Sequence, residues 1–137
     1  MIKTKIVKGI IEPYPSGDNR TNDGVELTFS GRVRDTEDGK KIKALEYECY
    51  REMAEKELRI LAEGTVKFFS VHDLYCQHRI GIIPVGESSV IVQIWSEHRQ
   101  ESLNAMEWFI TQLKDRVPIW KWAVFSNGAK IPTRENP

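Results

Sequence analysis

The sequence contains few cysteines and histidines, and this scarcity limits the chemistry that it can support. Only two cysteines occur, Cys49 and Cys76, and neither belongs to a Cys-x-x-Cys pair. A disulfide-rich framework is therefore excluded. The three histidines form no His-Glu-x-x-His pattern and show no metal-ligand spacing with the cysteines. Walker A and Gly-x-Gly-x-x-Gly motifs are also missing. The sequence thus gives no support for zinc hydrolases, P-loop nucleotide hydrolases or Rossmann oxidoreductases.

The sequence also lacks a surplus of charge of either sign and any long apolar run. Lysine plus arginine and aspartate plus glutamate each number 20, so the formal net charge is zero. A general nucleic-acid binder is usually basic, so we expect no nucleic acid partner. The apolar runs are a few residues long, far short of the roughly 20 that span a membrane. The first residues also lack the apolar stretch of a signal peptide, so we expect a cytoplasmic protein with no membrane contact.

What is present is typical of one globular domain. The chain has 137 residues, of which 40% are hydrophobic and 29% charged, and a second core would have little room. We expect a single domain over residues 1–137, with a variable strand and loop over 1–23 and a polar tail over 129–137. Alternating or β-branched segments predict strands, and period-3.6 segments predict helices. The expected strands are 3–11, 25–30, 45–49, 71–79, 89–95 and 120–125, and the expected helices are about 52–69 and 99–116.

This order predicts an α+β fold, with two main helices over an antiparallel or mixed sheet. The apolar stripe of the first helix runs from Ala54 through Leu58 and Leu61 to Phe69. The stripe of the second comprises Leu103, Met106, Ile110 and Leu113. Pro118 ends the second helix, because proline disfavours helical backbone in the residue before it.

Two lysines flank this helix end. Lys114 lies in the final helical turn and Lys121 in the following strand, on the face opposite Trp120 and Trp122. A helix that turns back into a strand brings both lysines together, and two close ammonium groups beside apolar walls favour a neutral amine. Such a lysine serves as a general base or nucleophile. The spacing fits equally a helix-terminal cation and an ordinary exposed strand lysine.

Further cations lie at two other junctions. His98 and Arg99 open the second helix, where backbone N–H groups favour an anion, although Arg99 also has Glu97 and Glu101 as neighbours. Arg32 and Arg34 alternate on a strand and suit either a phosphate or surface ion pairs. His78-Arg79 flanks a turn, and we interpret it as structural.

Several stretches together resemble the large, catalytic subunit of molybdopterin synthase. They occur in that family's order and cover about residues 24–128. The matching stretches are Phe29-Ser30-Gly31-Arg32-Val33-Arg34, Leu45-Glu46-Tyr47-Glu48-Cys49-Tyr50 with Met53-Ala54-Glu55, His78-Arg79-Ile80-Gly81, Val85-Gly86-Glu87-Ser88-Ser89-Val90, Ser96-Glu97-His98-Arg99 and Leu113-Lys114-Asp115-Arg116-Val117-Pro118-Ile119-Trp120-Lys121. The resemblance implies an α/β hammerhead-like fold.

The resemblance also implies a sulfurtransferase of molybdenum cofactor biosynthesis. Such an enzyme moves sulfur from the thiocarboxylated C-terminus of a small ubiquitin-like sulfur-carrier subunit to cyclic pyranopterin monophosphate, forming the molybdopterin dithiolene. The family assembles as a heterotetramer around a homodimer of large subunits. It requires no metal and no other cofactor for the transfer.

By position, Lys114 and Lys121 match the family's catalytic lysines. The other matches are to substrate-binding groups: Phe29, Arg34, His98, Arg99 and, with a one-residue gap, Arg134. The sequence departs from the family at Trp122-Ala123, where a basic residue and a glutamate are usual. This departure supports a second hypothesis, a catalytically silent member that acts as a partner-binding scaffold. A third, an anion-binding or nucleic-acid-binding module, rests on the arginines and is opposed by the zero net charge.

Overall fold

The computed structural model describes residues 1–17 and 19–133, which form nine strands and two helices. In chain order they are β1 (Ile2–Lys8), β2 (Val25–Arg32), β3 (Thr36–Glu37), β4 (Lys40–Lys41), β5 (Ala44–Cys49), α1 (Arg51–Phe69), β6 (Asp73–Pro84), β7 (Ser88–Ser96), α2 (Arg99–Arg116), β8 (Ile119–Val124) and β9 (Lys130–Thr133). The predicted α+β class with two main helices is confirmed. No helix in the described part of the chain is long and apolar enough to cross a membrane.

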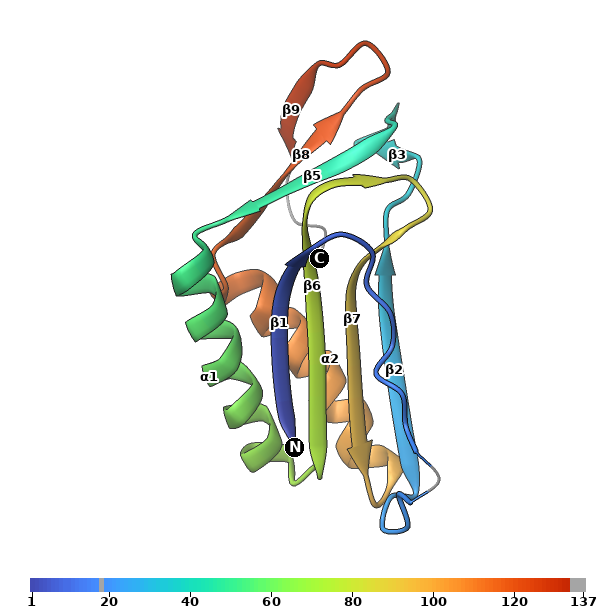
Figure 1. Ribbon diagram of the computed structural model, residues 1–137, viewed down its shortest axis with the longest axis vertical. Coiled ribbons are helices and arrows are strands. Elements are labelled where there is room, and N and C mark those ends of the chain that lie inside the picture. The colour runs from blue at the N-terminus through green and yellow to red at the C-terminus, as the bar shows by residue number, and fades with distance from the viewer. Residues whose placement is uncertain (18, 134–137) are drawn as a thin grey trace.

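The main sheet is mixed, and β6 connects its two parts. The strand order is β2-β7-β6-β5-β8-β9, with β1 joined in parallel to β6 and all other pairs antiparallel. β6 pairs with β7 over Asp73–His78 and with β5 from Gly81 onward. Gly81 has φ +91°, a conformation that glycine adopts without strain. Figure 1 shows the result: long strands below, with β5, β8 and β9 crossing above them.

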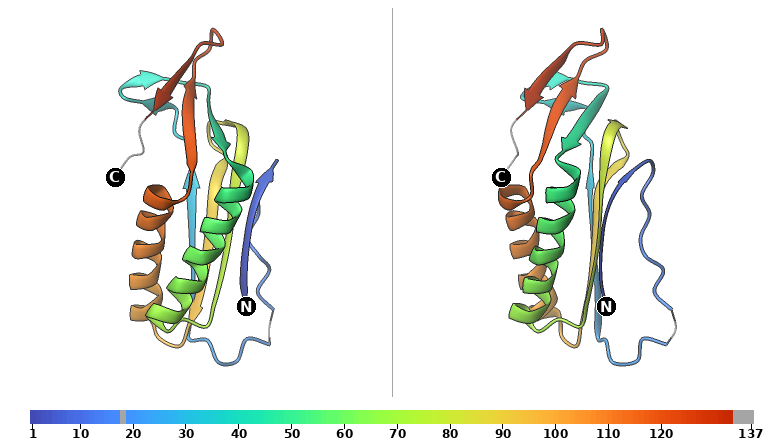
Figure 2. Two further views of the ribbon diagram at one scale, coloured as in Figure 1. Left: turned by 90° about the vertical axis from the view of Figure 1, so that its left-hand side faces the viewer. Right: turned by 60° about the vertical axis from the view of Figure 1, so that its left-hand side comes forward.

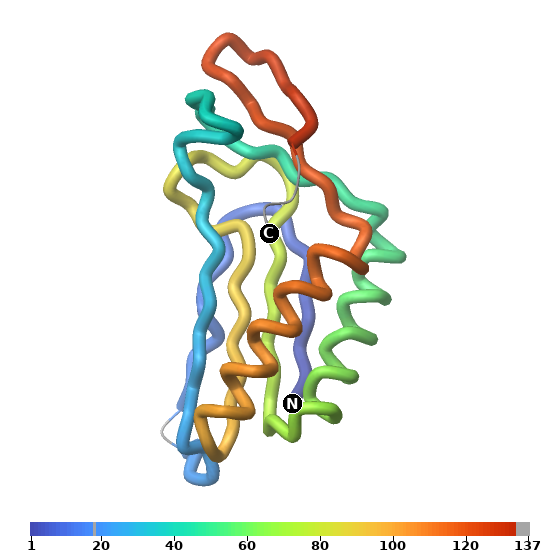
Figure 3. Tube along the Cα trace, turned by 180° about the vertical axis from the view of Figure 1, so that it is seen from behind, coloured from blue at the N-terminus to red at the C-terminus, as the bar shows by residue number. Residues whose placement is uncertain are grey.

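The two faces of the sheet are covered by different parts of the chain. Both helices lie on one face of the long strands, and the segment between β1 and β2 runs along the other face (Figures 2 and 3). This segment is fastened to the sheet by glutamine side chains. Gln93 exchanges hydrogen bonds with the backbone N–H and C=O of Tyr14, and Gln77 donates to the Glu12 carbonyl. The Tyr14 ring packs against Tyr75, with 4.8 Å between ring centroids.

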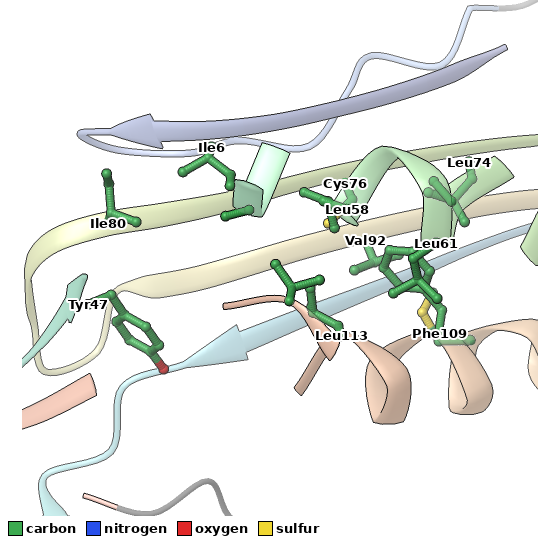
Figure 4. Packing of buried hydrophobic residues seen from close by; sticks show 14 of the residues in the cluster. Ile6, Tyr47, Leu58, Leu61, Leu74, Cys76, Ile80, Val92, Phe109 and Leu113 are labelled. Carbon is green, nitrogen blue, oxygen red and sulfur yellow. The ribbon is translucent and has the colours of Figure 1, made fainter. Parts of the chain in front are cut away.

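The hydrophobic core lies between the helices and the sheet, and it confirms the apolar face predicted for α1. Ala54, Leu58 and Leu61 are at most 1% exposed. Figure 4 shows Leu61, Val92 and Phe109 gathered in this layer. The helix continues through Gly64 and ends at Phe69, where Ser70 takes a left-handed conformation.

The stripe predicted for α2 is partly wrong. Leu103 is 48% exposed, whereas Phe109 is fully buried. The other buried positions of α2 are Ser102, Ala105, Met106 and Leu113. Small residues at Ser102 and Ala105 allow close packing, and a count of apolar side chains does not detect them. The Ser96 hydroxyl meets Ser102 Oγ at 2.5 Å and so satisfies a buried polar atom of this face.

Several predicted boundaries also differ, and β1 ends at Lys8, before the predicted end at residue 11. β6 extends to Pro84, past the predicted end at residue 79, because Gly81 bends the strand and does not end it. The polar tail predicted over residues 129–137 contains β9, which pairs with β8 over Lys130–Thr133. β9 is a short edge strand with a proline, and such a strand needs only one paired side and little apolar alternation, so the sequence pattern does not reveal it.

Candidate active site

One pocket of about 340 Å³ lies where the C-terminal end of α2 meets β5, β8 and the end of β2. We call it the basic pocket, since four of its lining residues are cationic: Arg32, Arg34, Lys114 and Lys121. The other residues that line it and enter the argument below are Phe29, Gly31, Glu37, Tyr47, His78 and Ile119. Four of the residues that the sequence nominated, Phe29, Arg34, Lys114 and Lys121, therefore meet at one cavity.

The turn between α2 and β8 places both lysines. The helix ends at Arg116, and Val117 is extended while its N–H donates to the Leu113 carbonyl at 3.2 Å. Strand β8 starts at Ile119, directly after Pro118. The Lys121 side chain is only 8% exposed, whereas Trp120 on the opposite face is 38% exposed. The predicted convergence of Lys114 and Lys121 on one site is thus present.

The end of β2 supplies the arginines. The register of β2 and β7 shifts between Gly31 and Arg32, and a bulge of this kind redirects the side chains that follow. A Cβ on Gly31 would lie 2.9 Å from Val90 Cγ1, so glycine permits the close approach of the two strands. Arg32 donates to the Gly86 carbonyl. Both Arg32 and Arg34 line the basic pocket, although β2 ends at Arg32 and Arg34 lies in the segment that follows the strand.

Glu37 is a pocket residue that sequence reasoning missed. It lies on β3, before a two-residue turn at Asp38 and Gly39 with φ +51° and +76°. Asp-Gly is a strong signal for this hairpin turn. The Glu37 residue is 7% exposed, and its Oε1 accepts a hydrogen bond from Thr133 at 2.8 Å. The same oxygen lies 3.9 Å from Lys121 Nζ. The contact with β8 and β9 is tertiary, so no local pattern predicts it.

Comparison with known proteins identifies the family. The model of the family described as MoaE protein matches residues 10–116. The chain belongs to the MoaE family. It is 38% identical over 109 residues to a molybdopterin synthase catalytic subunit of Thermoplasma volcanium, covering 80% of each chain. Its function is that of the catalytic subunit of molybdopterin synthase, and it is a sulfurtransferase.

Solved structures of MoaE relatives share the fold. The crystal structure of molybdopterin synthase from Staphylococcus aureus superposes with a TM-score of 0.75 at 32% identity, covering 88% of this chain and 92% of that one. A complex of subunits 1 and 2 of molybdopterin-converting factor from Helicobacter pylori contains a chain with TM-score 0.74 and 26% identity. That match covers 97% of this chain and 91% of the other.

His78 is a second pocket residue of this MoaE protein that sequence reasoning placed differently. It was expected beside a turn with a structural role, but it lies inside β6 and is 6% exposed. Its Nδ1 is 2.9 Å from the Arg79 carbonyl oxygen. A carbonyl only accepts, so Nδ1 carries the proton. Burial lowers the pKa of His78 to about 4, against a smaller raising effect of that hydrogen bond, so the imidazole is neutral at neutral pH.

The buried imidazole should make the protein less stable in acid. As the pH falls below 6.5, the unfolded chain binds a proton at His78, but the folded protein does not until about pH 4. The free energy of unfolding should therefore fall by about 3 kcal/mol from this group across that window. Urea unfolding at several pH values measures it. The free energy of unfolding of His78→Gln should depend less on pH than that of the wild type. The variant His98→Gln, changed at an exposed histidine, should behave like the wild type. Equal pH dependence in all three proteins would contradict a buried, neutral His78.

The structure does not bring His98 and Arg99 to the basic pocket of the same MoaE chain. Both are exposed at the N-terminal end of α2. Lys114 is 15 positions further along this helix, which corresponds to roughly 22 Å along its axis. Arg134 lies outside the described residues. Among the residues that are described, no group of three or more His, Cys, Asp or Glu side chains is placed to hold a metal ion.

Proposed function

We propose that the basic pocket is the site at which this subunit transfers sulfur from a thiocarboxylated C-terminus of a small ubiquitin-like subunit to cyclic pyranopterin monophosphate. The observation that carries the proposal is the convergence on one cavity of Lys114 from α2, Lys121 from β8 and Arg34 from the segment after β2. Lys114 and Lys121 transfer protons and stabilise developing negative charge. Arg34 binds the anionic substrate, and Phe29, which is 37% exposed, offers an aromatic face to the pterin.

The charges of the reactants suit this pocket. A thiocarboxylate and a cyclic phosphate are both anions, and their approach requires cations that offset the repulsion. Lys121 is almost completely removed from solvent, so its charge is screened less than that of a surface lysine. The partner brings the sulfur, so the site needs no cysteine of its own. Cys76, whose pKa burial raises, is fully buried and does not line the pocket.

A small subunit is the proposed sulfur donor. The relative from Helicobacter pylori was solved as a protein–protein complex of subunits 1 and 2, and this chain covers 91% of the matching subunit. We infer that the present chain binds an equivalent small subunit, with the C-terminal tail of that subunit entering the basic pocket.

A second copy of the chain is the proposed source of His98 and Arg99. Within one chain these residues lie at the far end of α2 from Lys114, so they reach the substrate phosphate only if another subunit supplies them. In an isologous dimer of two large subunits, an α2 N-terminus that lies at the neighbour's pocket in one direction does so in the other as well, so each site would receive both residues. This arrangement requires the homodimer that the family resemblance implies.

Complementation tests the shared site. Lys121→Ala and Arg99→Ala should each be nearly inactive. Mixing them with subunit exchange should restore about a quarter of the wild-type turnover, since half the dimers then contain one intact site of two. Mixing each variant with itself provides the control. If the mixture stays as inactive as its components, Arg99 does not act in a neighbouring subunit.

Turnover is the most direct test of the proposed function. The purified chain is combined with a thiocarboxylated small subunit and cyclic pyranopterin monophosphate, and molybdopterin is measured as product. A catalytically silent scaffold would bind the small subunit and give no product. The departure that favoured a scaffold, Trp122-Ala123, is next to Lys121 in the sequence but does not line the pocket. The Trp122 ring centroid lies 5.8 Å from Lys130 Nζ.

A further inference from the structure

Glu37 is the one acidic side chain among the described residues that line the basic pocket. Its side chain is 6% exposed, and a buried carboxylate costs free energy unless hydrogen bonds and an opposite charge compensate it. A pocket that binds two anions gains nothing from a bare negative charge. The presence of Glu37 therefore needs an explanation in terms of its partners.

Those partners belong to one pair of neighbouring strands. Lys121 of β8 and Thr133 of β9 are directly opposite in the strand register, and both contact Glu37 Oε1. The Thr133 hydroxyl donates to this oxygen at 2.8 Å and so fixes its position. The Lys121 ammonium lies 3.9 Å away, which is beyond hydrogen-bonding distance. Glu37 thus attracts the charge of Lys121 without using its N–H donors.

Among the described residues, the titratable groups other than Glu37 that line the pocket with Lys121 have the opposite electrostatic effect or none. Arg32 at the end of β2, Arg34 just after it and Lys114 of α2 are all cationic. β6 contributes the neutral His78 and β5 the Tyr47 phenol. Neighbouring cations and burial both disfavour a charged lysine. A carboxylate at 3.9 Å favours it.

We propose that Glu37 is a positioning residue that keeps Lys121 a charged ammonium with its N–H donors available to the substrate. This inference rests on the proposed function and assigns distinct roles to the two lysines. Lys121 enters the reaction as the proton donor and as the cation that stabilises developing negative charge. Lys114 is left as the group that accepts protons.

The pH dependence of turnover tests this division of roles. In Glu37→Gln the amide keeps the size of the side chain and an acceptor for Thr133 but removes the charge. The alkaline limb of the pH–rate profile should move about one unit to lower pH, with the acid limb unchanged. Turnover above the wild-type midpoint should fall about tenfold. Glu37→Asp, which restores a carboxylate, should recover part of the alkaline activity.

A matched control lies outside the pocket, between β5 and β9. Glu46 pairs with Lys130 at 3.0 Å, and neither residue lines the cavity, so Glu46→Gln should leave the profile unchanged. If Glu37→Gln loses activity equally at every pH, Glu37 has only a structural role and the proposal is wrong. If the acid limb moves instead, Lys121 works as the neutral amine, and the proposal is equally wrong.

A second readout needs no turnover. The side-chain NMR signal of Lys121, assigned with Lys121→Arg, should titrate at lower pH in Glu37→Gln than in the wild type. The signal of Lys130 should be unchanged. An unshifted Lys121 signal would overturn the role of Glu37 even in an active enzyme. If the wild-type chain shows no turnover, the proposed function fails, and the NMR titration still decides whether Glu37 controls the charge of Lys121.

Discussion

Replacing Lys121 by alanine should lower molybdopterin formation about 1000-fold, near the middle of the range for general acid–base groups. The expected loss is large because the ammonium is 8% exposed in a cavity, where water replaces a missing charge poorly. Lys114→Ala should cause a loss of similar order. Single-turnover rates with saturating thiocarboxylated small subunit measure the chemical step directly.

The control for this experiment is Lys130→Ala. Lys130 lies on β9 beside Trp122, with its side chain 45% exposed, and its removal takes one positive charge from the same sheet without touching the basic pocket. Turnover of this variant should stay within about twofold of the wild type, as is usual for surface substitutions. The small subunit should bind all three variants. If Lys121→Ala keeps most of its activity while Lys114→Ala loses it, the proton-donor role of Lys121 is wrong.

The sequence predicted those parts of the site that local rules determine. Pro118 requires the chain to leave the helix after Lys114, and alternation along the next strand places Lys121 opposite Trp120. The sequence also predicts that Arg32 and Arg34 lie on one face of a strand, but β2 ends at Arg32, so Arg34 reaches the same cavity from the segment that follows. These predictions depend on neighbours within a few residues, and the structure brings all four cations to one cavity.

The residues that sequence reasoning missed are those whose place depends on distant partners. Asp38-Gly39 predicts a turn, but only the pairing of β8 with β9 brings Thr133 and Lys121 to Glu37. Since residues 129–137 were taken as a tail, that pairing was not expected. His78 was placed near the end of a strand, beside a turn expected at Gly81, whereas this glycine bends a strand that continues to Pro84. The roles of His98 and Arg99 remain predictions that depend on a second subunit.

The second large effect concerns the helix that carries Lys114. Phe109→Ala should lower the free energy of unfolding by about 3–5 kcal/mol, because the ring is fully buried between helix and sheet. Phe68→Ala provides a matched control, since that ring is 78% exposed and its loss should cost about 0.5 kcal/mol or less. Urea denaturation with both midpoint and slope gives the comparison.

Urea denaturation of Leu103→Ala distinguishes the apolar stripe that the sequence predicts from the face that the structure buries. If the predicted stripe faced the sheet, Leu103 would be in the core and its truncation would cost about 2–5 kcal/mol. In the structure it is 48% exposed, so its truncation should cost about 1 kcal/mol or less. A large loss of stability in Leu103→Ala with a small loss in Phe109→Ala would mean that α2 turns a different face to the sheet. Lys114 lies one residue after the buried Leu113, so a different orientation of α2 would change how Lys114 lies relative to the basic pocket, and the stability of these variants also tests the geometry of the proposed active site.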